Sequence, residues 1–242
     1  MYAIPDTAFV VFGSEPMLDA RKRGWGETGR AIFRPPALPD RLADQLRAYH
    51  FVNGAPALPP PGSGTHYRRQ RGEDFAARLA NCLEDLAREG HRQVVLVGTD
   101  CPEIGEADIL EAYRAVCAGG SALGPDDKGG VYLIAIRLED RHRLSGIDWC
   151  RNVDLRQLRQ RLGHRPLHCL ATHADLDGTR DLRRLARRQA GPALMRITER
   201  ILNRILPMAV RGGHSRPLVR GIWIRRMLKY RDAPPAGIAA GA

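Results

Sequence analysis

The sequence predicts an α/β protein with a mostly parallel central sheet, on three observations. Short apolar runs at 7–13, 93–100 and 130–137 alternate with helical patterns, a rhythm typical of β-α-β units. The run 93–100 is continuously apolar, as expected for a strand covered on both faces. Nothing repeats at a fixed period, so a solenoid is not indicated. Ligands of such sheets bind at the carboxyl ends of the strands.

Length and composition are consistent with one large domain followed by a tail. The chain has 242 residues, of which 43% are hydrophobic, enough to bury a full core. No apolar run approaches the roughly 18 residues of a membrane-spanning helix. The five cysteines are spread out and contain no C-x-x-C pair, so neither a disulfide framework nor a zinc knuckle is predicted. The first residues do not resemble a secretory signal, and we expect a cytoplasmic protein.

The first half of the chain is predicted as follows. Residues 7–13 form a buried strand that ends in glycine, and the basic, glycine-rich stretch 14–30 follows it as a loop. A short helix is expected within 40–51, in a region with seven prolines between 35 and 64, and 57–64 as an exposed loop. Apolar residues at helical spacing predict a helix over 72–90, ending at a glycine.

The second half continues the alternation. We expect a strand over 93–100, a helix over 105–120, a stretch at 121–125 leading into a turn, and a strand over 130–137. A helix is predicted at 152–166, then a strand at 167–178 that runs into an acidic turn, and a further helix at 179–189. The predicted α/β domain therefore spans residues 1–189.

The strongest local signal for chemistry is the stretch VVLVGTDCPEI. Its apolar strand ends in Gly98, Thr99 and Asp100, which brings a carboxylate to the rim of the sheet. A hard cation bound to phosphates could use this oxygen ligand. The alternative is that Asp100 only caps the turn or helix that follows.

A second acidic cluster lies in HADLDGTRDL. Asp175 and Asp177 share one side of an extended backbone, because side chains alternate along a strand. Two such carboxylates can hold a divalent metal, although D-x-D is also common in solvated turns. His168 and His173 are nearby and could act as base or ligand, but each is also read as an ordinary histidine at a strand end.

Four stretches together resemble a known family. VVLVGTDCPEI, ALGPDDKGGVYLIAIR, LSGIDW and ADLDGTRDL, in this order, are similar to the small bacterial GT-A-type glycosyltransferases of the radical-SAM and selenodomain-associated group. The helix entry QRGEDFAARL is also similar, and the likeness covers roughly residues 7–188. It implies a nucleotide-diphospho-sugar transferase-like α/β/α sandwich, with a nucleotide-sugar donor and a small-molecule acceptor as partners.

The resemblance also implies site residues. Asp100 corresponds to the family's metal- or nucleotide-proximal acid, and Asp175 and Asp177 to its late acid pair, so these three are the predicted ligands of Mg²⁺ or Mn²⁺. Gly129 and Gly130 match the family's glycine turn, which would lie against the donor.

Lys128 departs from the family, which usually carries aspartate immediately before the paired glycines. Asp126 and Asp127 precede it and are candidate catalytic acids. Lys128 has two interpretations. Its ammonium could pair with a donor phosphate and replace part of a metal's charge, or it could repel the cation that the acids should bind.

The loop after the first strand departs further from the family. Its leading lysine and its glycine are replaced by Ser14 and Asp19. Arg21 and Lys22, with Arg23 beside them, still supply positive charge for a donor diphosphate.

The basic charge is concentrated in the tail. Residues 190–232 hold ten Lys or Arg against two acids, out of a net charge of +11. We expect a basic amphipathic helical extension over 190–232 and a disordered end over 233–242. Leu194, Ile197, Ile201 and Ile205 form an apolar stripe beside arginines. That helix either lies on an anionic membrane surface or packs on its own domain. The chain contains no recognisable nucleic-acid-binding module.

Three functions remain open at this point. A GT-A-fold sugar transferase is the leading hypothesis. The second is a non-catalytic relative that binds a nucleotide or a partner, favoured by Lys128 and the altered first loop. The third is a nucleotidyltransferase, which would release pyrophosphate instead of a nucleoside diphosphate.

Overall fold

The structure is a computed structural model, and it describes residues 5–54, 64–187 and 191–205. These residues belong to one compact unit that ends at Ile205. The predicted exposed loop at 57–64 falls almost wholly outside the described residues, and so does the tail beyond 205. No helix in the described part of the chain has the length and apolarity needed to cross a membrane.

A seven-stranded sheet forms the centre, in the order β3-β2-β1-β4-β6-β5-β7. The strands are β1 (Thr7–Ser14), β2 (Leu46–Asn53), β3 (His66–Arg69), β4 (Gln93–Val97), β5 (Ser121–Pro125), β6 (Val131–Arg137) and β7 (Leu167–Cys169). β6 pairs antiparallel with both of its neighbours, and the other pairs are parallel. The predicted α/β class with a mostly parallel sheet is confirmed.

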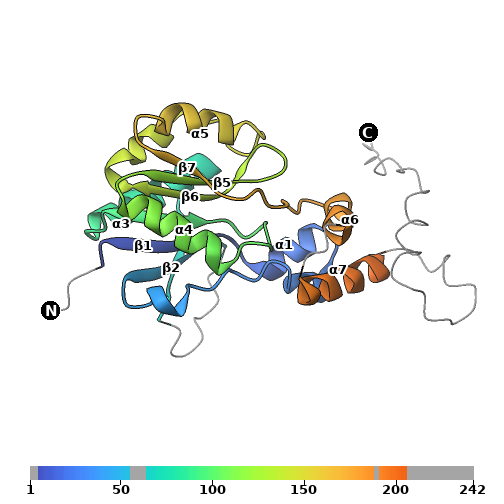
Figure 1. Cartoon of the computed structure of the whole chain (residues 1–242). Helices are drawn as coiled ribbons and strands as arrows, with labels where there is room; N and C mark the ends of the chain where they lie inside the picture. Colours follow the sequence, from blue (N-terminus) through green and yellow to red (C-terminus); the bar gives the residue numbers. More distant parts are fainter. Residues whose placement is uncertain (1–4, 55–63, 188–190, 206–242) are drawn as a thin grey trace, which may run out of the picture. The chain divides into compact units, whose positions relative to one another are not determined.

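Helices cover both faces of the sheet (Figure 1). They are α1 (Pro16–Lys22), α2 (Gly26–Arg30), α3 (Phe75–Arg88), α4 (Glu106–Cys117), α5 (Asp154–Leu162), α6 (Thr179–Arg187) and α7 (Pro192–Ile205), with 3₁₀ turns η1 (Asp40–Leu42) and η2 (Leu138–Leu144). α3 and α5 belong to the core on one face and α4 to the core on the other. Along β1, Val10 and Phe12 enter the first core and Phe9 and Val11 the second, as alternation along a strand requires.

A third core lies beyond the end of β1, where α1, α2, α6 and α7 meet (Figure 1). Trp25 is fully buried there and stacks on Phe33, with ring centroids 5.5 Å apart. Ile201 of α7 is also fully buried in this cluster. The apolar stripe of α7 therefore packs within the domain, which is the second of the two interpretations given to that helix.

Four local predictions were wrong. The stretch 14–30, expected as a loop, forms α1 and α2, because burial of Trp25 stabilises short helices that propensity alone does not favour. A helix was expected within 40–51, but residues 46–53 form β2, because all eight pair in register with β1. Residues 121–125 form strand β5 instead of only leading into a turn. The strand expected over 167–178 is much shorter, since β7 ends at Cys169.

Candidate functional site

The three predicted acidic stretches meet at one edge of the sheet. β1 and β4 are parallel and end there, and β6 begins there because it runs the other way. Asp100 follows β4, the turn 126–130 precedes β6, and 175–177 lies between them: the backbone N–H of Leu176 donates to the carbonyl of Asp100 (3.1 Å). The backbone of Asp126 forms an isolated bridge with His173. The topology thus collects side chains that are up to 77 residues apart in sequence.

Lys128 lies at the centre of the late acids. Its Nζ donates to Oδ2 of Asp175 (3.1 Å), Asp177 (2.8 Å) and Asp181 (3.0 Å). Burial would lower the pKa of Lys128, but the three carboxylates outweigh it and raise the pKa above its ordinary value. Burial raises the pKa of Asp175 to about 7, and Asp177 adds to the rise while Lys128 opposes it. The lysine is therefore a fully charged internal counter-ion.

Arg23 plays a similar part beside Asp100. Its guanidinium donates to Oδ1 of Asp100 (3.2 Å) and to the carbonyl of Leu176 (2.9 Å), and lies 3.5 Å from Oδ1 of Asp19. Cζ of Arg23 lies over the ring of Phe33, 4.7 Å from the ring centroid. With a side chain only 14% exposed, Arg23 is the cation that the third core holds against the acidic edge.

The predicted metal ligands already contact cations of the chain itself. Among the described residues, no group of three or more His, Cys, Asp or Glu side chains has the arrangement of a metal site. Oδ2 of Asp175 and Oδ2 of Asp177 contact Nζ of Lys128, and Oδ1 of Asp100 contacts Arg23. A divalent ion about 4 Å from an ammonium would be repelled by about 8 kcal/mol at the effective dielectric of a protein surface. The residues as arranged do not fit a resident divalent cation.

The turn before β6 is held by Asp126. Its Oδ1 accepts the backbone N–H groups of Lys128 (2.7 Å) and Gly130 (2.9 Å). Gly129 has φ +102°, and a Cβ there would lie 2.5 Å from the carbonyl oxygen of Asn152. This backbone conformation and close approach require glycine. The turn thereby fixes the backbone position from which the side chain of Lys128 reaches the three aspartates.

The remaining predicted residues lie at the margin. Asp127 accepts from the backbone of Asp175 (3.3 Å) and lies 3.7 Å from Arg184, so it ties the turn to α6. Arg21 and Lys22 are exposed on α1, and Nζ of Lys22 is 3.9 Å from Asp19. His168 pairs with Glu111, and His173 with Asp108 (3.0 Å). Both histidines thus have carboxylate partners on α4.

A hollow of about 250 Å³ opens at this edge. Carboxylates form part of its wall: Asp100, Asp126, Asp154, Asp175 and Asp177. The remainder is largely apolar, with Phe12, Phe75 and Trp149 among its lining residues. An aromatic wall beside convergent polar groups is typical of a small-molecule site.

The sequence analysis missed residues that the structure places at this site. Asp154 begins α5 and is 7% exposed, and its Oδ1 has no hydrogen-bond partner. Burial raises its pKa. Asp181 lies in the first turn of α6, and an acid three residues after Gly178 is a recognisable sequence signal for a helix start. Its Oδ2 accepts the backbone N–H groups of Asp177 (2.9 Å) and Gly178 (3.0 Å).

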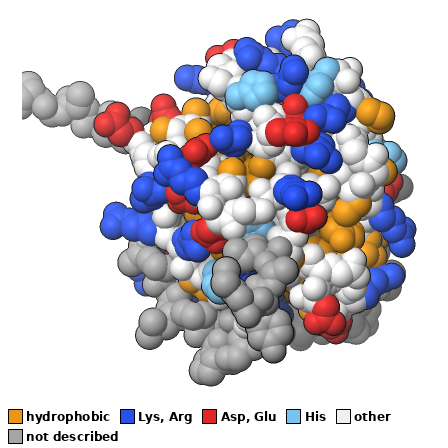
Figure 2. Space-filling model, turned by 90° about the vertical axis from the view of Figure 1, so that its left-hand side faces the viewer, with side chains coloured by type: hydrophobic (Ala, Val, Ile, Leu, Met, Phe, Trp, Pro, Cys, Tyr) orange, Lys and Arg blue, Asp and Glu red, His pale blue; other side chains and the backbone are white. Residues whose placement is uncertain are grey.

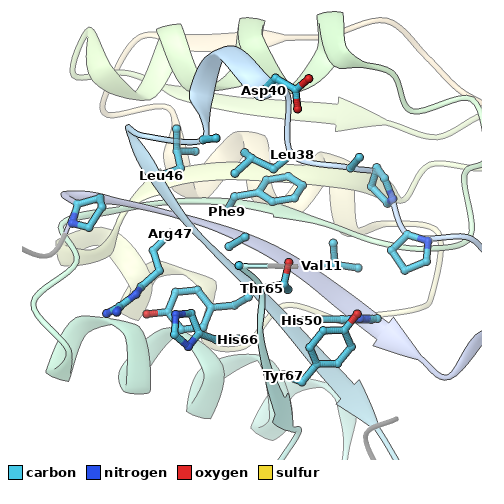
Figure 3. A pocket seen from close by; sticks show the side chains of 18 residues that line it. Phe9, Val11, Leu38, Asp40, Leu46, Arg47, His50, Thr65, His66 and Tyr67 are labelled. Atoms are coloured by element: carbon cyan, nitrogen blue, oxygen red, sulfur yellow. The ribbon is translucent and has the colours of Figure 1, made fainter. Parts of the chain in front are cut away.

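A second, larger hollow of about 580 Å³ lies elsewhere, between the segment 35–43 and the strands β1 to β3 (Figure 3). His50 and Tyr67 lie beside each other in its wall, with ring centroids 5.2 Å apart. None of the predicted site residues lines it. The chemistry expected from the sequence therefore belongs to the smaller, acidic hollow.

Comparison with known proteins agrees with this fold. Residues 35–151 match a family described as "Uncharacterized protein conserved in bacteria (DUF2064)". No curated protein matches the chain. A protein from Desulfovibrio desulfuricans G20, provisionally named a nucleotide-diphospho-sugar transferase, superposes with a TM-score of 0.64 at 19% identity, covering 83% of this chain and 98% of its own.

More distant structures include Rv0371c from Mycobacterium tuberculosis H37Rv, solved in complex with manganese. It has a TM-score of 0.46 and 20% identity, and covers 74% of this chain and 97% of its own. A cytidylyltransferase from Leptospira borgpetersenii has a TM-score of 0.47 and 10% identity, with coverages of 83% and 94%. Neither likeness is close enough to carry an argument about this chain. The resemblance of the motifs is confirmed at the level of the fold: the chain shares the nucleotide-diphospho-sugar transferase-like fold of the Desulfovibrio desulfuricans protein, and its residues 35–151 match the DUF2064 family.

Proposed function

We propose that the chain is a GT-A-fold transferase that binds a nucleotide-diphospho-sugar in the acidic hollow and transfers the sugar to a small-molecule acceptor. One observation carries the proposal: the hollow at the carboxyl edge of the sheet combines aromatic walls with convergent carboxylates, and two cations, Lys128 and Arg23, contact those carboxylates. This is the edge at which open α/β sheets bind ligands.

Different residues of the hollow and its surroundings would bind the ligand, balance its charge and accept a proton. The rings of Phe75 and Trp149 offer a surface for a base or a sugar, since aromatic faces stack on planar and apolar ligand surfaces. Arg23 and Lys128 supply the positive charge that a diphosphate leaving group needs. Asp154 has an unpartnered oxygen and a pKa raised by burial, which are the properties of a general base.

The reaction is a displacement at the anomeric carbon. The acceptor hydroxyl oxygen bonds to that carbon as the bond between the carbon and the diphosphate oxygen breaks. The electron pair leaves with the nucleoside diphosphate, and the hydroxyl proton passes to a carboxylate of the hollow. We assign that carboxylate to Asp154, whose Oδ1 has no hydrogen-bond partner and whose pKa is raised by burial.

The experiment is a product assay with a panel of nucleotide-sugars and the purified full chain. We expect release of nucleoside diphosphate, reduced at least about 100-fold in Asp154→Asn and weakened in apparent affinity about tenfold in Trp149→Ala. Arg92→Met is the matched control, because Arg92 is exposed and pairs with Asp6 at the opposite edge of the sheet. Release of pyrophosphate from nucleoside triphosphates would instead identify a nucleotidyltransferase.

A second candidate is a non-catalytic nucleotide-binding protein. It is favoured because Lys128 already forms ion pairs with three of the carboxylates that a metal or ligand would need. Binding of a nucleotide-sugar without turnover, by wild type and by Asp154→Asn alike, would decide for it.

A further inference from the structure

Lys128 uses its whole hydrogen-bonding capacity within the acidic cluster. An ammonium has three donors, and each of the three contacts of Nζ goes to a different aspartate. The side chain of Lys128 is 16% exposed. Since it is neither free in solvent nor bonded to backbone carbonyls, this lysine has the ligand set of a bound cation.

The three partners differ in exposure. The side chains of Asp175 and Asp181 are 17% and 9% exposed, whereas that of Asp177 is 65% exposed. Asp181 is also bonded to Arg184 (2.6 Å). Asp177 is therefore the carboxylate that can leave Nζ most easily, because water can solvate it as soon as it turns away.

Asp177 also links the two internal cations. Its Oδ2 accepts from Lys128, and its Oδ1 lies 3.9 Å from the guanidinium of Arg23. When Asp177 moves aside, a donor on Lys128 and the near side of Arg23 become accessible together. Two cations that face one oxygen-rich group are the arrangement that binds phosphate.

We propose that the chain holds the phosphate of its ligand with its own cations and without a divalent metal, and that a phosphate oxygen takes the place of Asp177 on Lys128. This inference depends on the proposed function in one respect, namely that the ligand carries a diphosphate. It assigns Lys128 and Arg23 as phosphate-binding residues and Asp177 as a resident competitor, whereas the sequence predicted Asp177 to be a metal ligand.

The two roles of Asp177 predict opposite results. If Asp177 competes with phosphate, Asp177→Asn removes both a rival and a repelling charge, so binding tightens by about 3- to 10-fold. If Asp177 is a metal ligand, the same substitution abolishes binding. Lys128→Met should weaken binding by about 10- to 100-fold, the loss expected for a charge-assisted hydrogen bond. Lys128→Arg should keep most of the affinity.

Calorimetric titration tests this with the full chain, four nucleoside diphosphates and inorganic pyrophosphate, in EDTA and again with Mn²⁺. Asp6→Asn and Arg92→Met are matched controls, because this pair is exposed (67% and 74%) where β1 enters the sheet. Figure 2 shows that face, with basic and acidic side chains interspersed over it. Thermal unfolding of each variant confirms that it is folded.

We expect wild-type affinities in EDTA and in Mn²⁺ to agree within about threefold, with the variant order given above. Binding that requires Mn²⁺ and is lost in Asp177→Asn would overturn the inference and leave the proposed transferase intact. Binding of pyrophosphate but of no nucleotide would keep the cation role and overturn the transferase. No binding of any phosphate probe in EDTA would also overturn the inference.

Discussion

Nζ of Lys128 lies 3.0 Å from Oδ2 of Asp181, a residue 53 positions further along the chain. The same oxygen accepts the backbone N–H groups at the start of α6. One carboxylate therefore joins the glycine turn before β6 to the helix that begins after the late acids. The side chain of Asp181 is only 9% exposed, and two cations balance its charge: Lys128 at Oδ2 and Arg184 at Oδ1.

Replacing Lys128 should destabilise the fold and create a cation site. Lys128→Met removes the cation shared by three carboxylates, of which Asp175 has no other cation in contact among the described residues, and this should lower the free energy of unfolding by about 2 to 4 kcal/mol. Mn²⁺ should then raise the melting temperature of the variant but not of the wild type, because only the variant lacks the ammonium that repels the ion and holds the three Oδ2 atoms. Differential scanning fluorimetry with and without Mn²⁺ measures both effects. An equal response of both proteins to Mn²⁺ would contradict the occupied arrangement.

The glycine turn should tolerate no side chain. Gly129→Ala adds a Cβ at φ +102° and 2.5 Å from the carbonyl oxygen of Asn152, so we expect a loss of about 2 to 4 kcal/mol. Gly24→Ala is the matched control: its φ is +71°, but no atom lies within 4 Å of the added Cβ, and it should cost about 1 kcal/mol. Urea unfolding of both variants gives the comparison. Equal losses would show that the close approach contributes nothing.

His50 should make stability depend on pH. It is 5% exposed, its Nε2 has no partner, and burial lowers its pKa to about 4 from 6.5. Because the folded pKa is depressed, the stabilisation is fully present above pH 6.5 and is lost as the pH falls through 4. The shift corresponds to a loss of up to about 3 kcal/mol. His50→Phe should flatten the dependence of the free energy of unfolding on pH below 6.5. Between pH 7 and 9 the difference in stability between variant and wild type should stay constant. Equal slopes of the two proteins below pH 6.5 would refute the assignment.

The buried stripe of α7 should contribute to the stability of the domain. Ile201 is fully buried in the third core, so Ile201→Ala should cost about 2 to 4 kcal/mol. Asn203→Ala, at an exposed position of the same helix, should change stability by less than about 0.5 kcal/mol. Chemical denaturation checks both. A negligible effect of Ile201→Ala would mean that α7 does not pack as described.

Prediction from the sequence succeeded where the pattern is local. The continuous apolar run of β4 and the helical spacing in α3 gave the right elements, because each segment carries its own periodicity. It failed at 46–51, where pairing with β1 decides the structure, and at 14–30, where Trp25 is buried by helices from the other end of the domain. Long-range pairing and burial of this kind leave little trace in a local window.

For the site, the sequence alone determined which residue types follow which strands: Asp100 after β4, the turn with Lys128 before β6, and the late acids after β7. It left Lys128 with two opposite roles. Only the tertiary structure decided that Nζ lies among Asp175, Asp177 and Asp181, with Arg23 on Asp100. The reason is physical: the sign of each charge can be read from the sequence, but an interaction energy depends on distance and burial, and these follow from the packing of the whole domain.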